Sequence, residues 1–77
     1  MGVRAWVLIE AVAGKGETVR ASLDDMECVK EVEQVTGLFD VIAQVEGSDM
    51  NAIGDIVTRQ IHAMAEITRT ITCAVVE

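Results

Sequence analysis

Residues 31–47, EVEQVTGLFDVIAQVEG, contain two runs of alternating apolar and polar residues with a short connection between them. The runs cover residues 29–35 and 41–45. Alternation is typical of strands with one buried face, and a glycine such as Gly37 adopts the positive φ that a tight turn needs. The stretch therefore predicts a β-hairpin. Its tip also carries Phe39 and Asp40, an aromatic ring and a carboxylate that a turn does not require.

Strand and helix patterns flank this hairpin on both sides. Residues 3–12 are rich in β-branched and aromatic types and residues 67–76 alternate, so both are expected to be strands. From residue 17 onward, apolar residues recur at helical spacing and predict a first helix. A longer apolar stripe predicts a second helix, with Ser48 as its N-cap. The second stripe consists of Met50, Ile53, Val57, Ile61 and Met64.

The resulting order, strand–helix–strand–strand–helix–strand, predicts a ferredoxin-like α+β sandwich. In this fold two right-handed crossovers place both helices on one face of an antiparallel four-stranded sheet. We expect a single domain over residues 1–77, of the kind that pairs into a dimeric α+β barrel.

The second face of the sheet is expected to stay uncovered within one chain. In the first strand Trp6 and Leu8 share one face while Val7 and Ile9 share the other, so both faces are apolar. A water-facing sheet surface is normally polar, and 51% apolar residues are more than the core of a 77-residue chain can hide. We therefore expect a homodimer with Trp6 and Leu8 at its interface. The alternative is that Trp6 lies in the core of the single chain.

Charge restricts the partners of the chain. Thirteen acidic residues against six basic ones give a net charge of −7, which a phosphate backbone or an anionic lipid would repel. The apolar run 5–9 is too short for a signal sequence or a membrane span. We expect a cytoplasmic protein without direct contact to nucleic acid or membrane.

Metal and cofactor chemistry has little support in the sequence. Cys28 and Cys73 lie far apart, outside any CxxC spacing and away from histidine, so they predict buried reduced thiols and neither a zinc site nor a disulfide. The acidic residues match no calcium loop. The prediction is therefore no metal site and no cofactor.

The hairpin tip carries groups that could hold a free amino acid. Backbone N–H groups around Gly37 could form a nest for a carboxylate, and Asp40 could accept the ammonium group. Phe39 would supply an apolar wall, and Thr36 a hydroxyl. The alternative is that Asp40 merely caps the turn and Phe39 packs beneath it.

The whole chain resembles the ligand-binding domain of the Lrp/AsnC (feast/famine) transcriptional regulators in its stand-alone form. The resemblance rests on VTGLFDVIAQVEGSD at residues 35–49, close to the family pattern Val-x-Gly-x-Tyr-Asp, and on ITRTITCAVVE at residues 67–77 with its alternating threonines. It implies sheet-packed dimers that assemble into rings, often octamers, with an amino acid or related metabolite bound between dimers. It implies the following ligand-site residues: Gly37, Phe39 and Asp40, with Val35, Thr36 and Leu38 beside them, and more weakly Thr70 and Thr72.

The chain also departs from the family pattern. Phe39 stands where the family usually has Tyr, Leu38 where a polar residue is common, and the Pro-Gly pair that usually precedes the last strand is missing. The helix-turn-helix of full-length regulators has no room before Val3, so we expect the chain to act without binding DNA itself. A full-length Lrp/AsnC regulator is a possible partner.

Three alternative functions compete with a sensor of the Lrp/AsnC type. One is a ligand-free assembly module, in which Asp40 has no binding role. Another is a dimeric α+β barrel enzyme, but the single histidine, His62, lies on the polar side of the second helix and has no nucleophile beside it, so no catalytic residue is predicted. The last is an ACT-type amino-acid sensor, whose ligand loop after the first strand would correspond to Gly14 and Gly16.

Overall fold

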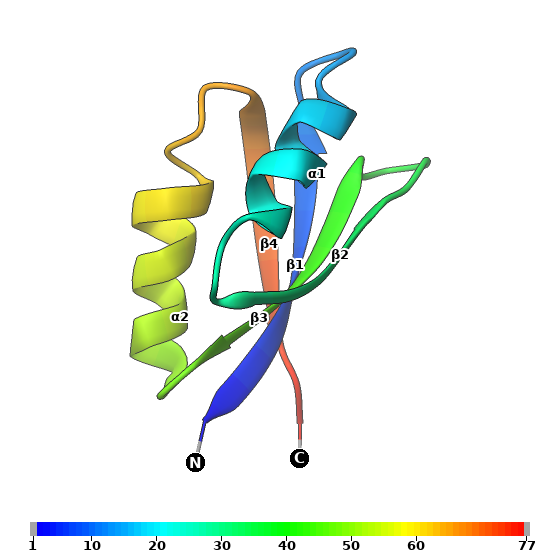
Figure 1. Ribbon diagram of the computed structural model, residues 1–77. Coiled ribbons are helices and arrows are strands. Elements are labelled where there is room, and N and C mark those ends of the chain that lie inside the picture. Colours follow the sequence, from blue (N-terminus) through cyan, green and yellow to red (C-terminus); the bar gives the residue numbers. More distant parts are fainter. Residues whose placement is uncertain (1, 77) are drawn as a thin grey trace.

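The computed structural model describes residues 2–76 and has the predicted order of elements (Figure 1). The strands are β1 (Val3–Ala11), β2 (Val29–Gln34), β3 (Val41–Gly47) and β4 (Ile67–Ala74). The helices are α1 (Gly16–Asp24) and α2 (Met50–Ile56), the latter continued by the wider π-type turn η1 (Val57–Ile61). The ferredoxin-like α+β fold is therefore confirmed.

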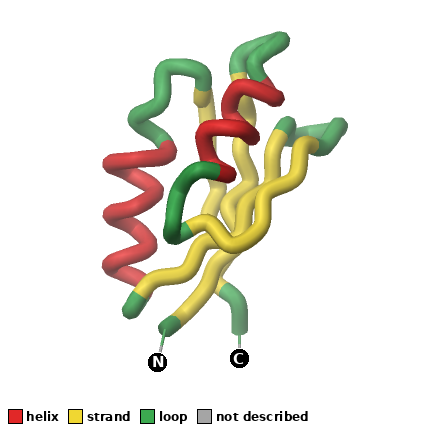
Figure 2. The backbone as a smooth tube through the Cα atoms, in the orientation of Figure 1, coloured by secondary structure: helices red, strands yellow, loops and turns green. Residues whose placement is uncertain are grey.

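The four strands form one antiparallel sheet in the order β2-β3-β1-β4. Both helices lie on the same face of it, as Figures 1 and 2 show. The core between helices and sheet is aliphatic, because alternate residues of β1 and β3 meet the apolar stripes of α1, α2 and η1. Its fully buried side chains include Val7, Ile9, Val19, Leu23, Val41, Val45, Ile53 and Ile61.

The start of α2 differs from the prediction by one residue. Asp49, and not Ser48, is the N-cap, and its carboxylate accepts a hydrogen bond of 2.8 Å from the amide of Ala52. Both residue types favour this position, so sequence alone could not choose between them. Met50 directly follows the cap and is 42% exposed, so it does not belong to the buried stripe.

The face opposite the helices carries Trp6 and Leu8. In the strand register Trp6 lies between Gln44 of β3 and Cys73 of β4, and Leu8 lies between Ile42 and Ile71. Trp6 is half-buried and is not part of the core, so the alternative that placed it there is wrong. We call this surface, built around Trp6, Leu8, Ile42, Ile71 and Cys73, the open face.

The two cysteines are free, but the expectation that both are buried is wrong. Cys73 is exposed on the open face, since β4 alternates and its helix-side positions are occupied by threonines and Ala74. Cys28 is half-buried and packs against the core.

Candidate functional site: the hairpin tip at one end of the sheet

The loop between β2 and β3, residues 35–40, lies at one end of the sheet together with the β1–α1 loop and the turn before β4 (Figure 2). Gly37 has φ of 127°, a left-handed value that L side chains rarely adopt, as the hairpin prediction required. The amide of Val35 donates to the carbonyl of Asp40 at 2.8 Å and closes the loop. Leu38 projects from it and is 88% exposed.

Asp40 is bound to the neighbouring strand β1. Its Oδ2 atom accepts a hydrogen bond of 2.8 Å from the amide of Ala11, and its own amide donates to the carbonyl of Ile9 at 2.9 Å. Within residues 2–76 its Oδ1 atom has no hydrogen-bond partner. The carboxylate thus fixes the tip to β1 with one oxygen and leaves the other available to a donor.

Phe39 contacts the last strand. The guanidinium carbon of Arg69 lies 5.3 Å from the centroid of the half-buried Phe39 ring, a distance typical of a cation–π contact. This pairing brings β4 to the hairpin tip. No sequence pattern predicted Arg69 as a site residue.

Glu10 and Thr68 complete this end of the open face. Glu10 lies opposite Arg69 in the register of β1 and β4, and the register shifts directly after it. Thr68 stands in that irregularity, with its hydroxyl 2.9 Å from Oε1 and 3.1 Å from the carbonyl oxygen of Glu10. A β-bulge of this kind has no clear sequence signal here, which is why these residues were missed.

The two threonines predicted as weaker candidates point elsewhere. Thr70 lies opposite Ile9 and Thr72 opposite Val7, so both share the helix-covered face of the sheet. Thr70 has its hydroxyl 3.4 Å from Nδ1 of the exposed His62. Within one chain the structure therefore does not bring Thr70 and Thr72 together with Phe39 and Asp40.

Within residues 2–76, no three His, Cys, Asp or Glu side chains form a group that could hold a metal ion. No helix in this range combines the length and the apolar character needed to cross a membrane. The loop between β1 and α1, which an ACT-type sensor would use, lies at the same end of the sheet as the hairpin (Figure 1), and its Gly14 has φ of 80°.

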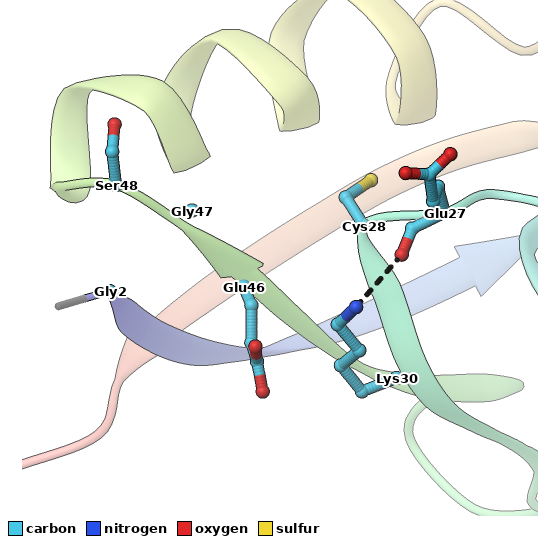
Figure 3. Close-up of a pocket in the computed structure, with 7 residues that line it drawn as sticks. All are labelled: Gly2, Glu27, Cys28, Lys30, Glu46, Gly47 and Ser48. Atoms are coloured by element: carbon cyan, nitrogen blue, oxygen red, sulfur yellow. Dashed lines mark hydrogen bonds between the residues drawn. The ribbon is translucent and has the colours of Figure 1, made fainter.

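An open pocket of about 570 Å³ lies at the other end of the sheet (Figure 3). It is lined by Gly2, Glu27, Cys28, Lys30, Glu46, Gly47 and Ser48. The ammonium group of Lys30 already donates to the carbonyl of residue 27 at 3.2 Å. The pocket shares no residue with the hairpin tip, so size alone does not identify it as the ligand site.

The sequence model of the Lrp/AsnC ligand-binding domain matches residues 4–77. Among solved structures, FFRP-DM1 is 34% identical, with a TM-score of 0.91 over 96% of this chain and 99% of its own. A Pyrococcus horikoshii protein described as hypothetical is 33% identical, with a TM-score of 0.89 over 97% of this chain and 90% of its own. No curated protein matches the sequence of the chain.

Two more distant structures contain L-methionine. A transcriptional regulator from Neisseria meningitidis in complex with L-Met is 19% identical, with a TM-score of 0.85 over 97% of this chain. A feast or famine regulatory protein from M. tuberculosis complexed with L-methionine is 22% identical, with a TM-score of 0.81 over 97% of this chain. This chain spans 50% of each of these two proteins, and at such identity the likeness shows the fold alone.

Proposed function

The chain belongs to the Lrp/AsnC ligand-binding domain family, and on this premise we propose that it binds an amino acid or a related metabolite at the tip of the β2–β3 hairpin and couples binding to assembly. The observation that carries the proposal is the hydrogen bonding of the Asp40 carboxylate. This carboxylate is fixed to Ala11 through one oxygen, while the other has no partner within residues 2–76. A fixed carboxylate oxygen is a suitable acceptor for the ammonium group of a ligand, because its position needs no further ordering.

The residues around Asp40 fit a ligand that is part charged and part apolar. Phe39 presents a half-buried ring, and Leu38 presents an exposed apolar side chain. The L-methionine complexes of two proteins with this fold support an amino acid as the ligand class. We therefore take L-methionine as the first compound to test.

Assembly is the second half of the proposal. The open face carries Trp6, Leu8, Ile42 and Ile71 with no helix over them. Apolar sheet surface of this kind is stabilised by packing against another apolar surface, and a second copy of the chain provides one. Dimers formed this way would join into a ring, with each ligand held between the hairpin tip of one dimer and the surface of the next.

Any role in transcription would then be indirect and cytoplasmic. The net charge of −7 disfavours contact with the DNA backbone. The chain would instead report metabolite levels through its assembly state or through mixed assembly with a full-length regulator.

A ligand-free assembly module is the second candidate, and the Asp40–Ala11 hydrogen bond favours it. That bond gives Asp40 a structural role that requires no ligand. The two candidates differ in what Asp40→Asn does: a ligand-free module has no binding to lose.

The test is thermal unfolding of the protein against a panel of L-amino acids that starts with L-methionine. A ligand present at 100 times its Kd adds about 2.7 kcal/mol to the free energy of unfolding, which raises the midpoint of so small a domain by roughly 10 °C or more. We expect such a shift with a small subset of the panel and its loss in Asp40→Asn. The control is Asp55→Asn, which removes an exposed carboxylate on α2. An unchanged midpoint across the panel would favour the ligand-free module.

A further inference from the structure

We propose that Arg69, held against the ring of Phe39, binds the carboxylate of the ligand while Asp40 binds its ammonium group. The inference rests on the proposed function and deepens it by naming the group that recognises the second charge. It replaces the turn amides around Gly37, which the sequence suggested for that task.

The first observation is that Arg69 contacts the Phe39 ring but has no anionic partner within residues 2–76. Its guanidinium lies 5.3 Å from the centroid of Phe39, and within residues 2–76 it makes no ion pair and no hydrogen bond. Arg20 shows the contrast, because its guanidinium binds the carboxylate of Glu17 at 2.8 Å. That hydrogen bond raises the pKa of Arg20 above its ordinary value.

The second observation explains why Arg69 stays unpaired in a chain of net charge −7. Glu10 lies directly opposite Arg69 in the sheet register, where a cross-strand ion pair would be expected. The Glu10 carboxylate instead meets the hydroxyl of Thr68 at 2.9 Å, because the register irregularity places Thr68 beside it. Within residues 2–76 the donors of Arg69 therefore have no acceptor, and we assign them to the ligand.

The chemistry of the guanidinium fits a ligand carboxylate. Its N–H groups form a planar fork that matches two carboxylate oxygens, and stacking on an aromatic ring limits the orientations that binding must fix. Phe39 and Asp40 are neighbours in the chain, so the guanidinium that contacts the Phe39 ring and the carboxylate of Asp40 both belong to the hairpin tip. A molecule that carries both an ammonium group and a carboxylate on one carbon atom could contact both.

This arrangement also gives the Phe39 ring a role that needs no hydroxyl. The contact with Arg69 uses the face of the ring. Phe39→Tyr keeps that face and is expected to preserve binding, whereas Phe39→Leu removes it and is expected to weaken binding.

The experiment is isothermal titration calorimetry with two probes, L-methionine and its carboxamide, L-methioninamide, which keeps the ammonium group and lacks the carboxylate. If the thermal panel selects another amino acid, that compound and its amide replace them. The variants are Arg69→Gln and Arg69→Lys. The matched control is Arg59→Gln, because Arg59 is exposed and lies on η1, in the helix layer on the other side of the sheet from Arg69.

We expect Arg69→Gln to weaken binding of the amino acid by about 10–100-fold, the range of a charge-assisted hydrogen-bonded contact. Arg69→Lys should keep part of the affinity, and Arg59→Gln should change it less than about twofold. The wild-type chain should bind the amide as weakly as Arg69→Gln binds the acid, and Arg69→Gln should not weaken the amide further. Unchanged thermal midpoints without ligand would show that the variants fold.

Two results would overturn the inference, and they differ. In the first, the amino acid binds the wild type and Arg69→Gln equally well, or Arg69→Gln lowers the affinity for the amino acid and for its amide by the same factor. Arg69 then does not bind the carboxylate, yet the proposed sensor function stands. In the second, no amino acid binds the wild type at all. The proposed function then fails, and this inference fails with it.

Discussion

Asp40 and Ala11 join the hairpin tip to strand β1 through a hydrogen bond of 2.8 Å between Oδ2 and the backbone amide. The amide belongs to the residue at which the pairing of β1 with β4 changes register. The bond therefore satisfies a backbone donor at an irregular point of the sheet. Asp40 stabilises the chain itself, whatever else it binds.

Replacing Asp40 by alanine is expected to destabilise the fold. The Ala11 amide would lose its acceptor, and a buried or half-buried donor without a partner costs about 1–3 kcal/mol. The midpoint of thermal unfolding, followed by circular dichroism at one protein concentration, should fall by several degrees. Asp40→Asn keeps an acceptor oxygen and should cost less than about 1 kcal/mol. An alanine variant as stable as the wild type would show that the bond contributes nothing.

Gly37 and Gly54 make a matched pair of glycine-to-alanine substitutions. At neither position would an added Cβ lie within 4 Å of another heavy atom, so a clash with neighbouring atoms contributes to neither substitution. Gly37 has φ of 127°, and strain there should cost about 1–3 kcal/mol. Gly54 lies inside α2 at an ordinary φ, and alanine there should stabilise the chain by about 0.5–1 kcal/mol. The free energy of unfolding is measured in urea. If both substitutions change it in the same direction, the assignment of strain to Gly37 is wrong.

Asp49 and Ser48 provide a similar comparison at the start of α2. The Asp49 carboxylate binds the Ala52 amide at 2.8 Å, so Asp49→Ala should lower the free energy of unfolding by about 1 kcal/mol. Ser48→Ala removes a hydroxyl that is not the cap, and its effect should stay within about 0.5 kcal/mol. Denaturant titrations measure both effects. A larger loss of stability in Ser48→Ala than in Asp49→Ala would identify Ser48 as the N-cap.

Periodicity accounts for most of the agreement between sequence and structure. Alternation in β1 predicted that Val7 and Ile9 share one face of the sheet and Trp6 and Leu8 the other. The apolar character of both faces left open which pair the helices cover, and the structure shows that they cover Val7 and Ile9. The positive φ of Gly37 also followed from residue type. These features depend on local geometry, in which the spacing of apolar residues sets which face each one occupies.

The contacts that build the candidate site could not be predicted in the same way. The pairing of Phe39 with Arg69 joins residues 30 positions apart, and a register shift between Glu10 and Ala11 accompanies the hydrogen bond from Thr68 to the Glu10 carboxylate. A bulge of one residue hardly changes the composition of a strand or its alternation of apolar and polar residues, so a single sequence does not reveal it. The sequence therefore located the hairpin tip and left its partner on β4 unidentified.

The open face supplies the last prediction, that its apolar surface holds two copies together. Leu8 lies at its centre, between Ile42 and Ile71, and Ile71 is 38% exposed in the single chain. In a dimer related by a two-fold axis, Leu8→Glu places one carboxylate from each copy in the interface. Burying two unpaired charges costs several kcal/mol, so the dissociation constant should rise by at least about 100-fold.

Sedimentation velocity across a range of protein concentrations measures this change directly. Met50→Glu is the control, because it introduces the same charge at the exposed first turn of α2, on the helix side of the sheet. We expect Leu8→Glu to sediment as a monomer at concentrations where the wild type and Met50→Glu remain assembled. Circular dichroism would check that the monomer retains its fold. If Leu8→Glu assembles like the wild type, the copies meet through another surface, and the edge strands β2 and β4 become the next candidates because each has one unpaired edge.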